Sequence, residues 1–179
     1  MRHLRGTSRG VHAGRGPRPH RVPDSAAPGR VHRGGPPVSH CISVAHSFET
    51  AHRLPHLPGK CESLHGHSWW AEVTVTAPRL AAGMVVEFGP FKSALRRWID
   101  DHLDHGVMLG PDDPLVGVLR QHGTKLYEVT GWPTVENVAA MLAEVAAEQL
   151  ADIVRAPGSF VSSVVVRETA VNRAAWTAP

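Results

Sequence analysis

The sequence predicts an α+β domain built around an antiparallel sheet. Three observations lead to this fold class. Runs that alternate between apolar and polar residues, as half-buried strands do, stand near both ends of residues 41–179. Between them lie two stretches whose apolar residues recur at helical spacing. Clusters of glycine and proline separate these runs, and no repeat of solenoid period is present. The expected order of elements is therefore β-β-α-α-β-β.

The strands of the first half are expected on either side of a loop. Residues 41–52 alternate and predict the first strand. Residues 53–62 hold two prolines and a glycine and predict the loop. Residues 68–76 predict a second strand, which extends from His65 and pairs antiparallel with the first. A short further strand is expected over residues 84–88, after a turn.

Two helices and two strands are expected in the second half. Residues 89–102 carry an apolar stripe at helical spacing. Residues 106–132 are interrupted by glycine and proline and predict a long excursion. The next helix begins near Thr134, which suits an N-cap position. The β-branched run over residues 161–167 and a short run over 172–177 predict the last two strands.

The charge divides the chain into two parts. Residues 1–40 hold eight arginines and one acidic residue, a net charge of +7, and few apolar side chains. Such a segment cannot bury enough surface to offset its ordering entropy, so we expect a disordered, dispensable basic extension. Residues 41–179 have a net charge of −4, which brings the chain to its overall +3. This mildly acidic domain offers no electrostatic basis for binding nucleic acid.

The two cysteines and the hydropathy indicate a cytoplasmic protein. Cys41 and Cys61 lie far apart and form no Cys-x-x-Cys motif, which fits a reducing compartment better than a disulfide framework. No apolar run approaches the length that spans a membrane. The N-terminus lacks the apolar stretch of a secretory signal. We therefore expect no membrane partner.

The most informative feature is a cluster of histidines around a cysteine. The motif His65-Gly-His67 places two imidazoles on the same face of a strand, and His52 on the neighbouring strand would complete a set of three. Three neutral imidazoles leave Zn²⁺ with an open coordination position, which is the catalytic pattern. Two alternatives stay open. The chain has thirteen histidines, so clustering by chance is one. A closed structural site with Cys61 as fourth ligand is the other.

Further residues suit proton transfer. A thiol beside a dication, as Cys61 would be, favours its thiolate form and could act as base or nucleophile. Asp104 precedes His105, and a histidine oriented by a carboxylate is a proton shuttle. Asp101 and His102 form a rival pair, and a histidine at a helix C-terminus also suits the helix dipole without any catalytic role.

One carboxylate suits the binding of a ring. Glu168 ends an otherwise apolar strand, where it could bind the N–H edge of a nitrogen heterocycle through paired hydrogen bonds. A strand end that simply meets solvent explains it equally well. Glu62 and Glu87 are further carboxylates near the histidines in sequence.

Five motifs occur in a characteristic order. They are Phe48-Glu-Thr-Ala-His52-Arg-Leu-Pro, Cys61-x3-His65-Gly-His67, Leu-Asp104-His105, Pro-Thr134-x-Glu-Asn137 and Arg-Glu168-Thr. As a set, over roughly residues 42–177, they resemble the 6-pyruvoyl-tetrahydropterin synthase / 6-carboxy-tetrahydropterin synthase family. The resemblance implies the tunnelling fold (T-fold). In this fold, β-β-α-α-β-β units carry their helices on one face of the sheet and form a barrel by oligomerisation, usually as a hexamer.

The resemblance also implies roles for the candidate residues. Zn²⁺ would bind His52, His65 and His67. Cys61, Asp104 and His105 would take the positions of the family's proton-transfer residues. Glu168 would anchor the pterin ring, and Thr134 lies in the segment that borders the pterin.

The implied reaction converts 7,8-dihydroneopterin triphosphate to 6-carboxy-5,6,7,8-tetrahydropterin, acetaldehyde and triphosphate, which feeds queuosine and other 7-deazapurines. Arg53, Lys60 and Arg173 are candidates for the triphosphate by their proximity to motifs. Alternatives within the family are 6-pyruvoyl-tetrahydropterin synthesis and, because Glu62 follows Cys61, aldolase-type cleavage to 6-hydroxymethyl-7,8-dihydropterin. Outside it, a zinc-stabilised binding module stays open. The excursion over residues 106–132 is longer than in compact members.

Overall fold

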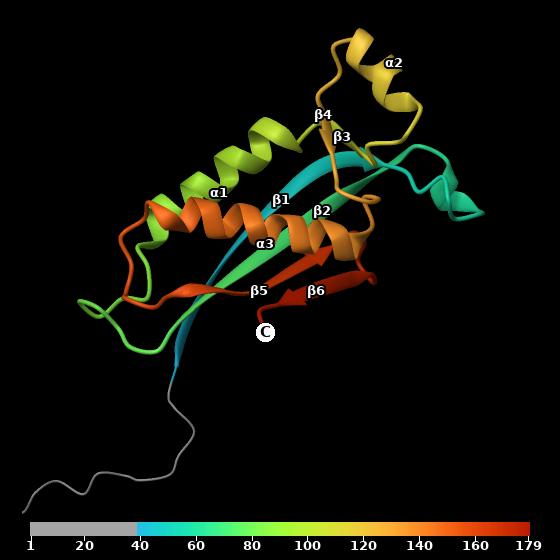
Figure 1. Cartoon of the computed structure of the whole chain (residues 1–179). Helices are drawn as coiled ribbons and strands as arrows, with labels where there is room; N and C mark the ends of the chain where they lie inside the picture. Colours follow the sequence, from blue (N-terminus) through green and yellow to red (C-terminus); the bar gives the residue numbers. More distant parts are fainter. Residues whose placement is uncertain (1–38) are drawn as a thin grey trace, which may run out of the picture. The chain divides into compact units, whose positions relative to one another are not determined.

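Six strands form one sheet, and two long helices cover one of its faces (Figure 1). The computed structural model describes residues 39–179, so all but the last two residues of the extension predicted over 1–40 lie outside the described residues. In chain order the elements are β1 (His40–His52), the 3-10 turn η1 (Lys60–Glu62), β2 (His65–Ala77), α1 (Phe88–His102), β3 (Gly106–Leu109), α2 (Leu115–Gln121), β4 (Leu126–Glu128), α3 (Val135–Ala151), β5 (Phe160–Arg167) and β6 (Arg173–Thr177).

β1 and β2 form the longest pairing of the sheet. They run antiparallel from His40, opposite Ala77, to His52, opposite His65. β5 pairs antiparallel with β2, and β6 pairs antiparallel with β5. The four longer strands predicted from the sequence therefore form one antiparallel set, as expected.

The segment between α1 and α3 departs from the prediction. Residues 106–132, expected as an excursion from the fold, contain β3, α2 and β4. β3 pairs in parallel with β1, and β4 pairs in parallel with β3. The sheet is therefore mixed rather than antiparallel, with the strand order β4-β3-β1-β2-β5-β6. Every residue of β3 is buried, so its sequence does not alternate and gives no strand signal.

The prediction of a short strand over residues 84–88 is wrong. Met84 and Val86 form only isolated bridges, and α1 begins at Phe88. Val85 and Val86 are nevertheless buried in the core. Their backbone is bonded to the connection between α3 and β5, where the Ala156 amide donates to the Val85 carbonyl at 2.8 Å. The apolar run thus reflects burial rather than membership of the sheet.

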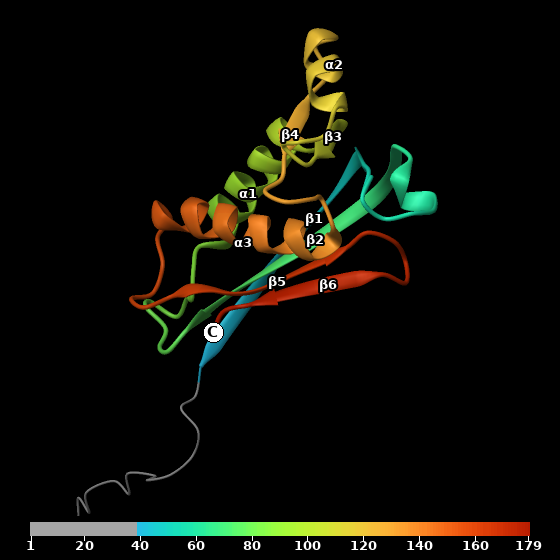
Figure 2. The ribbon, with the colours of Figure 1, turned by 45° about the vertical axis from the view of Figure 1, so that its right-hand side comes forward.

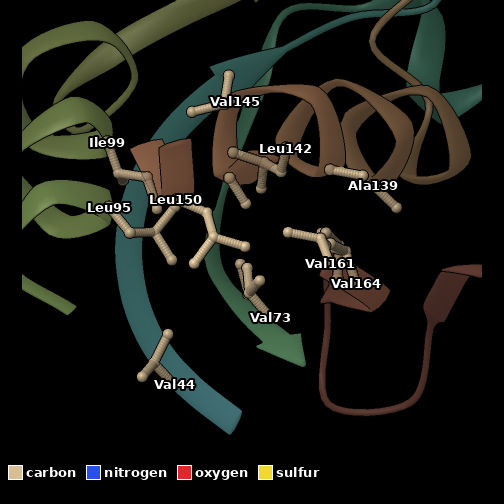
Figure 3. Packing of buried hydrophobic residues seen from close by; sticks show 14 of the residues in the cluster. Val44, Val73, Leu95, Ile99, Ala139, Leu142, Val145, Leu150, Val161 and Val164 are labelled. Atoms are coloured by element: carbon tan, nitrogen blue, oxygen red, sulfur yellow. The ribbon is translucent and has the colours of Figure 1, made fainter. Parts of the chain in front are cut away.

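The core lies between the helices and the sheet face that they cover. Figure 3 shows Leu95 and Ile99 of α1 and Leu142 of α3 directed toward Val73 of β2 and Val164 of β5, and all five side chains are buried. Each aliphatic side chain buried in this way contributes roughly 1.5–3 kcal/mol relative to an exposed one. This packing decides which face of β1 and β2 turns inward. Within residues 39–179, no helix combines the length and hydropathy needed to cross a membrane.

One end of the sheet gathers segments that are far apart in the sequence. In Figures 1 and 2 the C-terminal end of β1, the start of β2, the end of β5 and the N-terminal end of α3 lie at the same end. A hydrogen bond from His52 to Pro133 and a close approach of Glu168 to His52 connect these segments. The candidate site lies at this end.

Candidate metal centre and active site

Three histidines converge on one side of the β1–β2 pair. His52 stands directly opposite His65, and His67 stands opposite Thr50. The ring centroids are 4.6 Å apart for His52 and His65, 4.9 Å for His65 and His67, and 5.2 Å for His52 and His67. One ring nitrogen of each residue lies within 4.8 Å of the others. The three histidines predicted as ligands therefore form a group that can hold a metal ion.

Backbone carbonyls fix the orientation of two of the rings. His52 donates from Nδ1 to the Pro133 carbonyl at 2.8 Å, and His65 donates from Nδ1 to the Ser63 carbonyl at 2.7 Å. Because a carbonyl oxygen only accepts, the proton of each neutral ring lies on Nδ1 and the lone pair stays on Nε2. Histidines that bind metals are oriented in this way by an acceptor on their other nitrogen.

The Nε2 atom of His52 is buried and, within residues 39–179, has no hydrogen-bond partner. An oxygen of Glu168 lies 3.2 Å from this nitrogen and 3.8 Å from Nε2 of His67, but the contact with His52 lacks hydrogen-bond geometry. A buried lone pair and a carboxylate oxygen repel each other at this distance unless a cation lies between them. The donor set therefore fits a bound cation.

The protonation of His52 favours a metal ion over a proton as that cation. Burial lowers the pKa of His52 below its ordinary value, and this effect outweighs the hydrogen bond to Pro133 and the charge of Glu168. The ring is therefore neutral at neutral pH, which is the form that binds metals.

Glu168 enters the site from the turn between β5 and β6. The Thr169 hydroxyl accepts hydrogen bonds from the amides of Val171 and Asn172, at 3.3 and 3.0 Å, and the Glu168 amide donates to the Asn172 carbonyl at 3.2 Å. This compact turn holds the Glu168 carboxylate against His52, with 17% of its side chain exposed. A strand end that merely meets solvent does not describe this position.

Asp104 and His105 form a hydrogen-bonded pair beside β1. One oxygen of Asp104 accepts from Nδ1 of His105 at 2.9 Å, and the other accepts from the Glu49 amide at 2.8 Å. Partial burial opposes ionisation, but these hydrogen bonds, the charge of His105 and the Lys125 charge lower the pKa of Asp104. The His105 backbone adopts φ +55°, and 79% of its side chain is exposed. The pair thus has the carboxylate-to-histidine arrangement that a proton relay requires.

The rival pair of Asp101 and His102 has no such arrangement. The His102 ring stacks on Trp98 at 4.5 Å between centroids, and its Nδ1 donates to the Trp98 carbonyl at 2.8 Å. His102 therefore packs within α1.

Cys61 lies in η1, within the loop that joins the two histidine strands. Its carbonyl accepts from the Leu54 amide at 2.7 Å, and its thiol is exposed and free. Within residues 39–179 the ligand group consists of the three histidines and does not include Cys61. The geometry thus gives no support to the closed site with Cys61 as fourth ligand.

Thr134 begins α3, as predicted, and accepts from the Asn137 amide at 3.3 Å. Nothing in the sequence indicates that the preceding carbonyl, of Pro133, orients His52. Backbone acceptors leave no residue-type signal, so only the folded chain reveals this contact.

The residues considered for a triphosphate are not equivalent. Lys60 and Arg173 are exposed. Arg53, in contrast, donates from Nε and Nη2 to both oxygens of Asp113, at 2.7 and 2.6 Å. Its guanidinium is therefore already bound to a carboxylate, a contact that the sequence did not indicate because the two residues lie in different predicted segments.

The sequence model of 6-pyruvoyl tetrahydropterin synthase matches residues 41–179. The chain belongs to the 6-pyruvoyl tetrahydropterin synthase family. The resemblance inferred from the five motifs is therefore confirmed, and the match spans nearly all of the described domain.

Several relatives are named 6-carboxy-5,6,7,8-tetrahydropterin synthase. The protein of Rickettsia typhi is 37% identical over 98 residues, which cover 53% of this chain and 71% of the relative. The protein of Rickettsia conorii is 33% identical over 125 residues, which cover 68% and 88%. The protein of a Synechocystis species is 36% identical over 103 residues, which cover 53% and 80%.

Solved structures share the fold. An uncharacterized protein of Wolinella succinogenes has a TM-score of 0.67 and 24% identity, covering 78% of this chain and 98% of its own. The 6-pyruvoyl tetrahydropterin synthase of Caenorhabditis elegans has a TM-score of 0.58 and 22% identity, covering 79% and 97%. The family fold implied by the motifs is thus present, with the mixed sheet described above.

Proposed function

We propose that this protein is a zinc-dependent 6-carboxy-5,6,7,8-tetrahydropterin synthase. It converts 7,8-dihydroneopterin triphosphate to the carboxy product with release of acetaldehyde and triphosphate, in the route to queuosine and other 7-deazapurines. The observation that carries the proposal is the convergence of His52, His65 and His67 beside the Glu168 carboxylate. The names of the relatives support the carboxy product over the pyruvoyl product.

The three histidines would hold Zn²⁺ through their Nε2 atoms, as the carbonyl contacts of His52 and His65 favour. When bound, the ion supplies Lewis acidity toward the side-chain oxygens of the substrate. Cys61 removes a proton from the substrate side chain. A free thiol in this role suits a reducing, cytoplasmic setting.

The other residues bind and relay. Glu168 accepts paired hydrogen bonds from the N–H edge of the pterin ring, and Thr134 borders the pterin at the start of α3. His105, oriented by Asp104, relays protons. Asp104 stays ionised at neutral pH because its pKa is lowered, so it stabilises the protonated ring of His105.

We also propose that the active form is a homo-oligomer, as a hexamer whose sheets join into barrels. The order of the sheet places β4 and β6 at its edges, and within residues 39–179 each edge strand pairs on one side only. Another copy of the chain would cover such edges.

Product analysis tests the reaction directly. The zinc-loaded protein is incubated with 7,8-dihydroneopterin triphosphate, and the pterins and acetaldehyde are measured. We expect 6-carboxy-5,6,7,8-tetrahydropterin and acetaldehyde in equal amounts. Recovery of 6-hydroxymethyl-7,8-dihydropterin would instead support aldolase-type cleavage through Glu62, and a pyruvoyl product would support the third chemistry of the family.

A Cys61→Ser variant separates an enzyme from a zinc-stabilised binding module. We expect zinc to be retained and turnover to fall by about 10²–10⁴-fold, the usual contribution of a positioned acid–base group. The matched control is Cys41→Ser, because Cys41 is also exposed but lies at the far end of β1. Loss of zinc and of folding in Cys61→Ser would indicate a structural site.

A further inference from the structure

The segment over residues 106–132, with Pro133 directly after it, contacts the chain around His52 at three places. Its first strand, β3, pairs in parallel with the last three residues of β1. Its middle contributes Asp113, which binds Arg53. It ends next to Pro133, whose carbonyl accepts from the ring of His52. A segment predicted from the sequence as an excursion therefore pairs with the strand that carries a metal-ligand candidate and binds the residue that follows it.

The ion pair of Arg53 and Asp113 links this segment to the residue that directly follows β1. The Asp113 side chain is completely buried and that of Arg53 is 18% exposed. Asp113 also accepts from the Leu115 amide at 2.9 Å, at the start of α2. Two parallel N–H···O bonds fix the relative orientation of guanidinium and carboxylate, which a single contact does not. Arg53 directly follows His52, so this pair fixes the chain at the residue next to the ligand.

The two ends of the segment are held together. β3 and β4 pair over three residues of each strand. Gly110 lies so close to the following connection that an added Cβ would stand 2.6 Å from the Gly131 carbonyl and 2.8 Å from the Trp132 ring. Only glycine permits this approach. Gly110 lies three residues before Asp113 and Gly131 two residues before Pro133, so this approach joins the part of the segment that holds Asp113 to the part that leads into Pro133.

We propose that Arg53 and Asp113 are positioning residues for the metal centre. By holding the 106–132 segment against β1, they keep the Pro133 carbonyl on Nδ1 of His52, so that Nε2 of the buried ring points at the metal. Arg53 thus acts through His52 and not as a ligand of the substrate triphosphate. The inference rests on the proposed metal centre, but not on the identity of the product.

Zinc affinity of the metal-free protein tests the proposal. Asp113→Asn keeps the size of the side chain and removes its charge, and Arg53→Lys keeps the charge and removes the two-pronged donor. We expect the dissociation constant for zinc, measured by competition with a chelator, to rise about 10- to 100-fold in each variant, as for other groups that orient metal ligands. Arg120→Gln is the matched control, because Arg120 pairs with Glu128 in the same segment at an exposed position.

Two results would overturn the proposal. The first is a folded Asp113→Asn or Arg53→Lys protein that binds zinc as tightly as the unaltered protein. The second is an equal loss of zinc affinity in Arg120→Gln, because the effect would then be a general loosening of the segment. Circular dichroism of the metal-free variants checks folding, and Arg53→Lys carries the test where Asp113→Asn does not fold, because its side chain reaches solvent.

The tautomer of His52 gives a second readout. If Arg53 and Asp113 had only a general structural role, their replacement would not change this tautomer selectively. Nitrogen-15 NMR of the metal-free protein reports which ring nitrogen carries the proton. We expect His52 to change from the single Nδ1–H form to a mixture in both variants, while His65, which is bonded to Ser63, keeps its form. An unchanged His52 tautomer contradicts the proposal. Neither readout uses a pterin, so the product assay fails or succeeds independently.

Discussion

His52 and His65 face each other across β1 and β2, yet the chain holds them in different ways. The His65 ring is partly exposed and bonds to Ser63, two residues away. The His52 ring is fully buried and bonds to Pro133, 81 residues away. One candidate ligand is therefore positioned by a residue just before its own strand and the other by the packing of the whole domain. A metal ion bound between them would connect local structure to global stability.

The largest expected effect is a difference between the two histidines in how much each contributes to the free energy of unfolding. His52→Ala and His65→Ala should both abolish tight zinc binding. In the metal-free protein, however, His52→Ala should lower the free energy of unfolding by about 2–3 kcal/mol, because the cavity and the unbonded Pro133 carbonyl outweigh the relief of the repulsion between Nε2 and Glu168. His65→Ala should lower it by less than about 1 kcal/mol, because the ring is partly exposed. Urea unfolding measures both values, and equal losses would contradict the distinction.

The two strands and the side of the site around His65 could be predicted from the sequence, because their signals are local. Alternation marks both strands, and the spacing His65-Gly-His67 places two rings on one face whatever else the chain does. The Thr134 cap and the strand before Glu168 were predicted for the same reason. These features depend on neighbours within a few residues, so one sequence suffices to find them.

The contacts that hold His52 could not be predicted from the sequence, because they are long-range. β3 has four buried residues and no alternation, and the Pro133 carbonyl has no residue-type signature. The pairing of Arg53 with Asp113 spans 60 residues and ends in a stretch interrupted by glycine and proline, which was predicted as irregular. Such contacts are decided by tertiary packing, which overrides local propensity.

The pH dependence of the metal-free protein sharpens the comparison further. The pKa of His52 is lowered in the folded protein from the ordinary 6.5, so below pH 6.5 the unfolded chain binds a proton that the folded chain does not. Stability should therefore fall as the pH drops below 6.5, by at most about 1.4 kcal/mol per pH unit, until the lowered pKa is reached. Urea unfolding between pH 7.5 and 5.5 measures this slope.

A His52→Gln variant is the control for this slope. It keeps a polar side chain at the site and removes the titrating ring, so the difference in slope from the unaltered protein belongs to His52. The lowered pKa values of Asp104 and Asp113 act in a lower range, since their ordinary value is 3.8. Identical slopes in the two proteins would show that the burial of His52 does not govern its protonation.

A smaller effect is expected where α3 begins. Thr134→Ala removes the hydroxyl that accepts from the Asn137 amide, which should lower the free energy of unfolding by about 1 kcal/mol. Because Thr134 follows Pro133, the same change should weaken zinc binding through the His52 side of the site. Thr134→Ser keeps the hydroxyl and should restore both. If Thr134→Ala weakened zinc binding without any change in stability, Thr134 would act on the site by some route other than capping.

The smallest effect is expected at Ser63, next to the locally held His65. His65 bonds to the backbone carbonyl of Ser63, not to its side chain. Ser63→Ala should therefore leave the zinc dissociation constant within about twofold of the original value and the His65 tautomer unchanged. Chelator competition measures the first and nitrogen-15 NMR the second. A clear loss of affinity would mean that the Ser63 hydroxyl helps to orient His65, and the contrast between a backbone-held and a packing-held ligand would then rest on His52 alone.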